Sequence, residues 1–166
     1  MTRVTADAID LADPALDRAD DDALPAGALA GSWRIEHAIA TGGYGRVYAA
    51  RHHVLDGRRA AIKVLHRACA AQPATARRFL DEARGVSRLR HPAIVEVIDV
   101  GYLADRRPWI AMELLAEHNL AHRLAAAGAL TLDEAIALVA PVAGALDAVH
   151  AAGLVHRDVT AHNLGF

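Results

Sequence analysis

Three strand-like segments in the first half of the chain, joined by two short turns, limit its possible folds more than any other feature. Apolar and polar residues alternate through 33–40, 46–53 and 59–66, as they do in half-buried strands. The glycine-rich stretch TGGYG joins the first two segments, and Asp56-Gly57, a strong hairpin signal, joins the second and third. We therefore predict an antiparallel sheet of at least three strands.

Strand and helix patterns alternate in the middle of the chain and give way to helices toward its end. We expect strands over 91–102 and 108–115 and helices over 73–89, 119–128 and 131–153. Pro73 suits a first helical position, and Asn119 suits an N-cap. Thr131 and Glu134 have capping-box spacing, whereas Pro141 should kink the last helix, because proline costs about 3 kcal/mol inside a straight helix. Strands followed by helices indicate an α+β fold without a second domain.

Composition narrows the classes of protein to which the chain can belong. It has 166 residues and a formal net charge of −2, which gives no sign of an electrostatic nucleic-acid binder. The longest apolar run, over 135–149, is interrupted by proline and is too short to cross a membrane. Cys69 is the only cysteine, which excludes an internal disulfide and fits a reducing compartment. We expect a cytoplasmic protein that does not bind nucleic acid and has no membrane segment in this chain.

Residues 1–30 differ from the rest of the chain. Aspartates sit among alanines there, with two prolines and no aromatic residue. Such a segment buries too little apolar surface to offset its ordering entropy, so we predict an acidic, disordered leader. A solvated helix through 13–24 is the alternative.

Lys63 is the only lysine of the chain, because all other basic residues are arginine. It lies in the apolar run AAIKVLH, where a compact ammonium suggests a specific role rather than a solvated face. The helix expected at 73–89 has a buried stripe of Phe79, Ala83 and Val86. Glu82 lies on or beside that stripe, and we expect Lys63 to be its partner while Arg78 points elsewhere. The alternative is that Glu82 reaches water at the edge of the stripe.

Two loops carry residues suited to phosphate chemistry. Gly42, Gly43 and Gly45 lie at the tip of a predicted hairpin, where glycine lets the backbone approach phosphate oxygens, although an ordinary glycine turn would look the same. Near the end of the chain, Asp158 in His-Arg-Asp precedes Asn163 by five residues. The carboxylate could accept a proton from a hydroxyl, and the amide oxygen could ligate Mg²⁺. The alternative is an Arg–Asp pair in a polar loop.

The chain contains an ordered set of motifs: the glycine loop, AAIK, a helical glutamate, HP before a strand, MELL and HRDVTAHN. This ordered set resembles the protein kinase signature set. The resemblance is to the eukaryotic-like serine/threonine kinases of bacteria and covers about residues 33–166. It implies an antiparallel five-stranded small lobe with helix C, followed by the first helices of an incomplete large lobe. The corresponding regions are a leader over 1–30, small lobe and hinge over 31–115, and helices D and E with the catalytic loop over 116–166.

The resemblance also implies a role for each matching residue. Lys63 would hold the α- and β-phosphates, with Glu82 as its ion-pair partner, and Asp158 would be the catalytic base. Asn163 would ligate the metal, and Arg157 would read activation-loop phosphorylation. The implied cofactors are ATP and Mg²⁺, and the implied substrates are serine and threonine hydroxyls of proteins. The implied nucleotide-binding set is Ile39, Gly42, Gly43, Gly45, Val47, Ala61, Lys63, Met112 at the gatekeeper position, and the hinge residues Glu113 and Leu115.

The sequence departs from the kinase pattern in three places. Ala40 replaces the first loop glycine, and Thr160 replaces a lysine that contacts the γ-phosphate, so we expect slower transfer. The sequence also stops at Phe166, before the Asp-Phe-Gly segment that holds the second metal ligand. We therefore expect the intact protein to be a kinase and this chain alone to be inactive. An uncovered apolar face on the helix over 131–152 would favour association.

Other functions stay open at this point. The chain could be a short nucleotide-binding or regulatory module without catalysis. It could also be a small-molecule phosphotransferase of the aminoglycoside kind, which shares the Asp-to-Asn spacing, although Arg157 and the HP and MELL elements favour the protein kinases. His118 and His122 have the spacing of metal ligands on a helix, but without a third ligand nearby a solvated face is the simpler interpretation.

Overall fold

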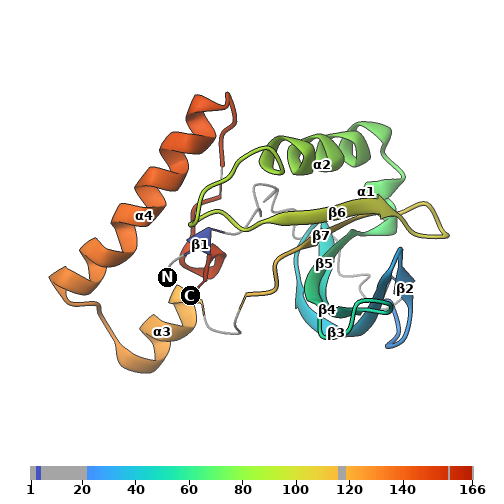
Figure 1. Ribbon diagram of the computed structural model, residues 1–166, viewed down its shortest axis with the longest axis horizontal. Helices are drawn as coiled ribbons and strands as arrows, with labels where there is room; N and C mark the ends of the chain where they lie inside the picture. The colour runs from blue at the N-terminus through green and yellow to red at the C-terminus, as the bar shows by residue number, and fades with distance from the viewer. Residues whose placement is uncertain (1–2, 5–21, 116–118, 157, 166) are drawn as a thin grey trace. The chain divides into compact units, whose positions relative to one another are not determined.

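The computed structural model describes residues 3–4, 22–115, 119–156 and 158–165 (Figure 1). Its contacts divide the chain into two compact units. The sheet unit comprises the described residues of 9–84 and 97–114, and the helical unit comprises those of 1–8, 85–96 and 115–166. The helical unit thus includes 85–96, which our sequence division had placed with the small lobe.

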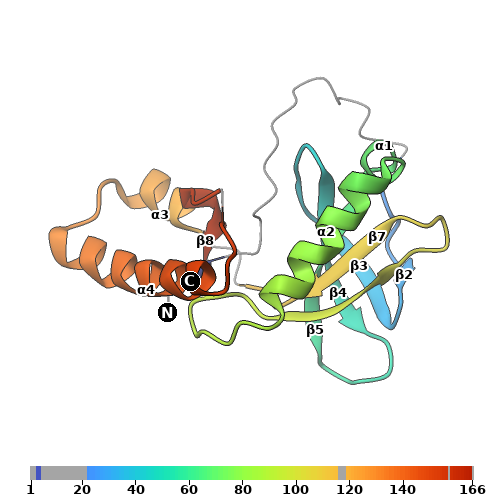
Figure 2. The same cartoon turned by 90° about the horizontal axis from the view of Figure 1, so that it is seen from above.

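The sheet unit contains a six-stranded, fully antiparallel sheet in the order β2-β3-β4-β5-β7-β6 (Figure 2). Its strands are β2 (Leu29–Ala30), β3 (Trp33–Thr41), β4 (Gly45–His52), β5 (Arg59–Leu65), β6 (Val97–Tyr102) and β7 (Pro108–Met112). Helices α1 (Arg67–Ala70) and α2 (Pro73–Val86) connect β5 to β6. The predicted hairpin between β4 and β5 is confirmed, and Gly57 at its tip has a φ of 74° that favours glycine.

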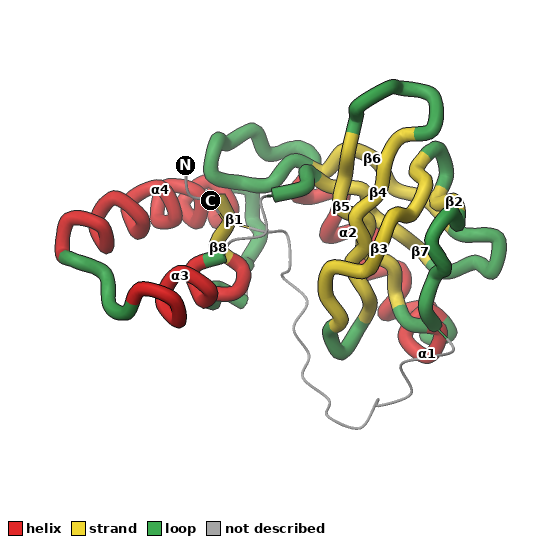
Figure 3. The backbone as a smooth tube through the Cα atoms, turned by 90° about the horizontal axis from the view of Figure 1, so that it is seen from below, coloured by secondary structure: helices red, strands yellow, loops and turns green. Residues whose placement is uncertain are grey.

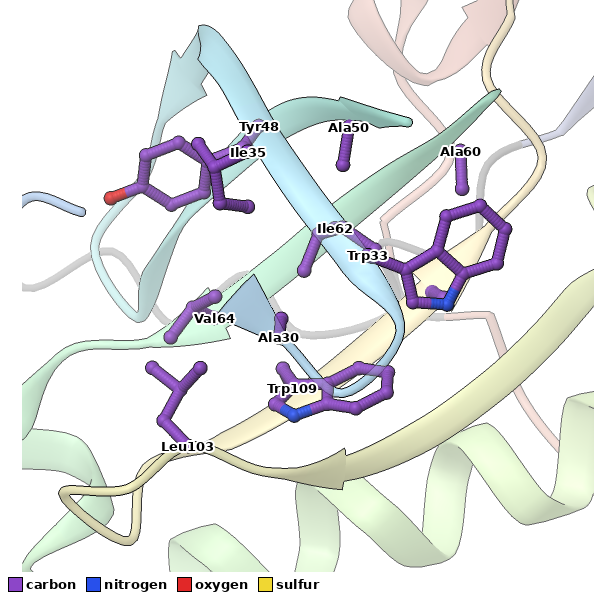
Figure 4. Close-up of a cluster of buried hydrophobic side chains, with 11 residues drawn as sticks. Ala30, Trp33, Ile35, Tyr48, Ala50, Ala60, Ile62, Val64, Leu103 and Trp109 are labelled. Carbon is purple, nitrogen blue, oxygen red and sulfur yellow. The ribbon is translucent and has the colours of Figure 1, made fainter. Parts of the chain in front are cut away.

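Each face of the sheet contributes to a separate core. One cluster lies within the curl of the sheet and includes both tryptophans, Trp33 and Trp109, together with Tyr48 and Ile62 (Figure 4). The other cluster joins Leu65 and Ile110 to the buried face of α2, formed by Phe79, Leu80 and Ala83. Because successive strand residues point to opposite faces, one set of strands supplies both clusters. The tube view shows the curl of the strands (Figure 3).

The α+β prediction and the kinase-like architecture are confirmed, but the sheet has six strands rather than five. The additional strand is β2, whose Ala30 is fully buried and which reaches β3 through Gly31 at a φ of 58°. The predicted leader therefore extends too far, because residues 22–30 are part of this fold. Its remaining residues, apart from 3–4, lie outside the described part of the chain.

The strand expected over 91–102 begins only at Val97. Before it, the Ile94 amide donates to the carbonyl of His91 at 3.0 Å, and the His91 ring accepts from the Ala93 amide at 3.2 Å. These local turns use the backbone groups that a strand would need, and Ala93 packs into the helical unit instead.

The helical unit is built on α3 (Leu120–Ala127) and α4 (Leu132–Ala151), with the 3₁₀ turn η1 (Ala161–Asn163) and a two-stranded pairing of β1 (Arg3–Val4) with β8 (Leu164–Gly165). Both predicted caps are present, since Asn119 accepts from the His122 amide and Thr131 forms a capping box with Glu134. Helix α4 is a single element that contains Pro141. Within the described residues, no helix has the length and apolar character needed to cross a membrane.

Candidate functional site

Strand register brings four of the predicted nucleotide-binding residues to one face of the sheet. Lys63 on β5 lies opposite Val47 on β4 and Ile110 on β7. One pleat away, Ala61 lies opposite Met112. Directly opposed residues share a face, and so do residues two apart on a strand. Val47, Ala61, Lys63 and Met112 therefore share a face, as their predicted common role requires.

Helix α2 covers this same face. Ile110, which lies opposite Lys63, belongs to the cluster formed with Phe79 and Ala83 of α2. The side chain of Lys63 is buried, with 9% of the residue exposed. A buried ammonium is costly unless charged or polar groups surround it. The register thus places Lys63, the only lysine of the chain, on the face of the sheet that α2 covers, and Figure 2 shows α2 lying across the strands.

The structure corrects the expected orientation of Arg78. Its Nε donates to Glu82 Oε1 at 2.9 Å, because residues four apart are neighbours on a helix surface. The other carboxylate oxygen, Oε2, is buried and has no hydrogen-bond partner among the described residues. One carboxylate oxygen of Glu82 is therefore held by Arg78, and the other is buried without a hydrogen bond from the described residues. The pairing of Glu82 with Lys63 stays a prediction.

The glycine loop forms a tight turn between β3 and β4. The Gly42 amide donates to the Gly45 carbonyl at 2.9 Å. Gly45 is buried, and a Cβ there would overlap the backbone carbonyl of Val64, so this position needs glycine. Gly43, by contrast, is exposed. A register irregularity in β3 lies between Ala38 and Ala40, and Ile39 within it is 45% exposed.

The hinge residues fall at the boundary between the two units. Met112 ends β7 and is buried, and Glu113 after it is partly buried. Leu115 belongs to the helical unit, where its side chain lies directly against Gly165. A Cβ at Gly165 would fall about 2.5 Å from Leu115 Cδ1, so this glycine allows the hinge to pack on the chain just after the catalytic loop.

The catalytic loop is held together by its own side chains. Asn163 donates from Nδ2 to both the backbone carbonyl and the carboxylate of Asp158, the former at 3.1 Å. The ring of buried His156 accepts a hydrogen bond from the backbone amide of Asp158 at 3.4 Å. The backbone amide of Asn163 donates to the Thr160 carbonyl at 3.0 Å. Asp158 and Asn163 therefore lie together, as their spacing predicted. The exposed side chain of Thr160 lies on the same loop.

The loop is fixed to the helical unit at its end. Leu164 directly follows Asn163 and packs among Ala93, Leu138 and Val142 in the buried cluster of that unit. Arg157 and His118 lie outside the described residues, so their predicted roles stay predictions.

The oxygen donors of the catalytic loop fit a hard divalent cation. Asn163 donates to Asp158 through Nδ2, and its side chain also carries Oδ1, an amide oxygen of the type that ligates such a cation. Mg²⁺ prefers oxygen ligands and keeps several waters, so one or two protein oxygens suffice. Within the described part of the chain, the catalytic loop included, no three His, Cys, Asp or Glu side chains are grouped to hold a metal.

No sequence pattern indicated that His66 contacts the glycine loop or that Asp22 contacts His66. His66 lies three residues after Lys63 and contacts Gly42 through its ring, and Asp22 contacts His66 in turn. Both contacts join residues more than twenty positions apart, and no periodicity in the sequence reports them. Arg78, in contrast, could have been found from its spacing to Glu82.

Comparisons with known proteins agree with this geometry. A family model described as "Protein kinase domain" matches residues 33–165. The serine/threonine-protein kinase PknA of Mycobacterium tuberculosis is 39% identical over 140 residues, which are 82% of this chain and 32% of PknA. The serine/threonine-protein kinase pkn3 of Myxococcus xanthus is 34% identical over 87% of this chain and 26% of its own length. The chain thus spans about a third or less of these relatives.

Solved structures give the same result. The kinase domain of M. tuberculosis PknI matches with a TM-score of 0.73 at 35% identity, over 87% of this chain and 59% of that structure. The apo form of PpkA-294, at 24% identity and a TM-score of 0.67, shares the fold.

Proposed function

Because the chain belongs to the family of protein kinase domains, we propose that the protein carrying it transfers the γ-phosphoryl group of ATP to serine or threonine hydroxyls of proteins. The observation that carries this proposal is the pairing of Asp158 with Asn163 on one short loop. The Asp158 carboxylate, held in this way, suits the role of a proton acceptor, and the neighbouring Asn163 suits that of a metal ligand. The kinase resemblance seen in the sequence is confirmed at the level of the family.

The sheet unit would bind the nucleotide. The ammonium of Lys63 would hold the α- and β-phosphates, and the buried Oε2 of Glu82 would hold Lys63 in place. Val47, Ala61 and Met112 share the face of Lys63 and offer an apolar surface for the adenine. We propose Ile39, the loop glycines and the hinge residues Glu113 and Leu115 as further contacts.

The catalytic loop would act on the acceptor. The Asp158 carboxylate would orient the hydroxyl of the protein substrate and accept its proton as the hydroxyl oxygen bonds to the γ-phosphorus. The bond from the γ-phosphorus to the β-phosphate oxygen breaks in the same step, and ADP leaves. Asn163 keeps the carboxylate in place through its amide N–H and would give its Oδ1 to Mg²⁺. When bound, Mg²⁺ neutralises charge on the transferring phosphoryl group. Thr160 would give a hydrogen bond to the γ-phosphate where related kinases place a lysine.

The regional assignments belong to the same proposal. We assign the sheet unit to the small lobe and the helical unit to the start of the large lobe. On α4, Leu132, Ile136 and Val139 are 76%, 57% and 56% exposed, and we expect this apolar face to favour association. The cytoplasmic location expected from the lone Cys69 stays a prediction.

A phosphate-transfer assay with radiolabelled ATP tests the proposal. We expect the full-length protein to label a protein substrate, and expect both Lys63→Met and Asp158→Asn to abolish labelling while circular dichroism stays unchanged. The matched control is Asp133→Asn, at an exposed position in the first turn of α4, which should label normally. Labelling that survives either Lys63→Met or Asp158→Asn would contradict the role assigned to that residue.

A further inference from the structure

Three consecutive carbonyls of the glycine loop face the corner between β5 and α1. His66 Nε2 lies 3.0 Å from the Gly42 carbonyl oxygen, and the His66 amide donates to the Tyr44 carbonyl at 2.8 Å. Between them, the Cys69 thiol donates to the Gly43 carbonyl with an Sγ–O distance of 4.0 Å. The loop is therefore held along its length by two residues of this corner.

The ring of His66 is held on its other side by Asp22. His66 Nδ1 lies 3.3 Å from Asp22 Oδ2, and the two side chains are only 12% and 13% exposed. Asp22 is itself fixed at several atoms. Its carboxylate accepts from the Arg67 amide at 2.9 Å and pairs with Arg67 Nε at 3.2 Å, and its carbonyl accepts from buried Arg107 at 2.7 Å. His66 thus connects an anchored carboxylate to the glycine loop.

The surroundings of Cys69 in this corner also favour its protonated thiol, the form that can donate a hydrogen bond. Burial, and then the nearby Asp22 carboxylate, raise the pKa of its thiol. The thiol therefore keeps its proton at neutral pH and remains a donor to the Gly43 carbonyl.

Holding these carbonyls determines where the loop amides point. In a planar trans peptide, the C=O of one residue and the N–H of the next point in opposite directions. With the Gly42 and Gly43 carbonyls directed toward the corner, the N–H groups of Gly43 and Tyr44 are directed away from it. Outward-facing loop amides are the groups that bind phosphate oxygens.

We propose that His66 is a positioning residue for the nucleotide-binding loop, and that Asp22 anchors it there. This inference rests on the proposed function only for the identity of what the loop binds. The contacts of His66 and Asp22 are made within the protein and do not involve a nucleotide. His66 does not touch the substrate in this account. It acts through the Gly42 carbonyl, and Asp22 acts through His66.

Hydrogen–deuterium exchange of the chain without nucleotide tests the positioning directly. His66→Phe keeps a ring of similar size and removes both ring contacts, and Asp22→Asn removes the charge while keeping an acceptor for the Arg67 amide. We expect both to speed exchange across 42–45 by about two- to tenfold, as the loss of one hydrogen bond allows. The control Glu36→Gln breaks exposed pairs with Arg51 and Arg59, outside the loop, and should leave 42–45 unchanged.

Affinity for Mg-ATP separates positioning from general stability. We expect His66→Phe to weaken binding about two- to tenfold with the melting temperature nearly unchanged, and expect His66→Gln, which keeps one donor for Gly42, to restore part of it. Wild-type exchange across 42–45 in both His66→Phe and Asp22→Asn would overturn the proposal. If the unaltered chain does not bind Mg-ATP, the proposed function fails, while the exchange result still decides the role of His66.

Discussion

In the sheet unit, Lys63 lies on the interior strand β5, which pairs with β4 and β7 and is covered by α2 on the face of Lys63. In the helical unit, by contrast, Asp158 lies on a loop that side-chain hydrogen bonds hold. The first arrangement is set by strand register and the burial of apolar side chains. The second depends on a few contacts made by Asn163 and His156. Changes to the core should therefore damage the sheet unit most, and single polar changes should damage the loop most.

The packing difference gives the largest expected effect. Ile62 is fully buried in the sheet core, and Ile136 on α4 is 57% exposed. Ile62→Ala should lower the free energy of unfolding by about 2–5 kcal/mol, because it removes buried methylenes and leaves a cavity. Ile136→Ala should change it by less than about 0.5 kcal/mol. Urea unfolding followed by circular dichroism compares the two, and equal losses would mean that α4 is covered in solution.

The catalytic loop should be sensitive to loss of the side-chain amide of Asn163. Asn163→Ala removes both hydrogen bonds to Asp158 and the proposed metal oxygen, so we expect kcat of the full-length protein to fall at least about 10–100-fold. Stability should change far less than in Ile62→Ala, since Asn163 is only partly buried. Steady-state kinetics with ATP and a protein substrate measure the change. An unaltered kcat would show that another group holds Asp158.

Acid should weaken the sheet unit through Asp105. Burial by itself raises the pKa of Asp105, but hydrogen bonds from the amide and guanidinium of Arg107 and the charge of Arg67 outweigh burial and lower that pKa below its ordinary value of 3.8. Its stabilisation is therefore complete above that ordinary value and is lost as pH falls through the lower, folded-state pKa. Unfolding measured from pH 5 to pH 2 should show a smaller pH dependence in Asp105→Asn than in the unaltered chain. Identical slopes would contradict this assignment.

The smallest expected effect concerns Arg78. Its ion pair with Glu82 is between residues 39% and 27% exposed, so Arg78→Ala should cost only about 0.3–0.5 kcal/mol in stability. It should leave affinity for Mg-ATP unchanged or slightly higher, because Glu82 is then released toward Lys63. Arg77→Ala, which breaks the more exposed pair with Asp81 on the same helix, is the matched control. A clear loss of affinity in Arg78→Ala alone would mean that Arg78 holds Glu82 in its productive position.

Much of the fold could be predicted because its signals are local. Alternation marked β3, β4 and β5, the Asp56-Gly57 pair marked their hairpin, and the spacing of Thr131 and Glu134 marked the start of α4. Strand β2 and helix α1 were missed because two and four residues are too few to show a period.

The candidate site was predictable to the extent that its residues act within one element or loop. Asp158 and Asn163 could be paired from their spacing, and Lys63 from its unusual setting. The contact of His66 with Gly42, and that of Asp22 with His66, depend on how distant segments fold together. No local pattern encodes those contacts, and only the folded chain reveals them.

In the proposed function, the sheet unit holds the nucleotide and the catalytic loop performs the transfer. Isothermal titration of Mg-ATP into the unaltered chain, Lys63→Met and Asp158→Asn tests this division most directly. We expect Lys63→Met to weaken binding by at least about tenfold, as the loss of a charged contact implies, and Asp158→Asn to bind within about threefold of the unaltered chain. Equal losses in the two variants, or full affinity in Lys63→Met, would contradict the account.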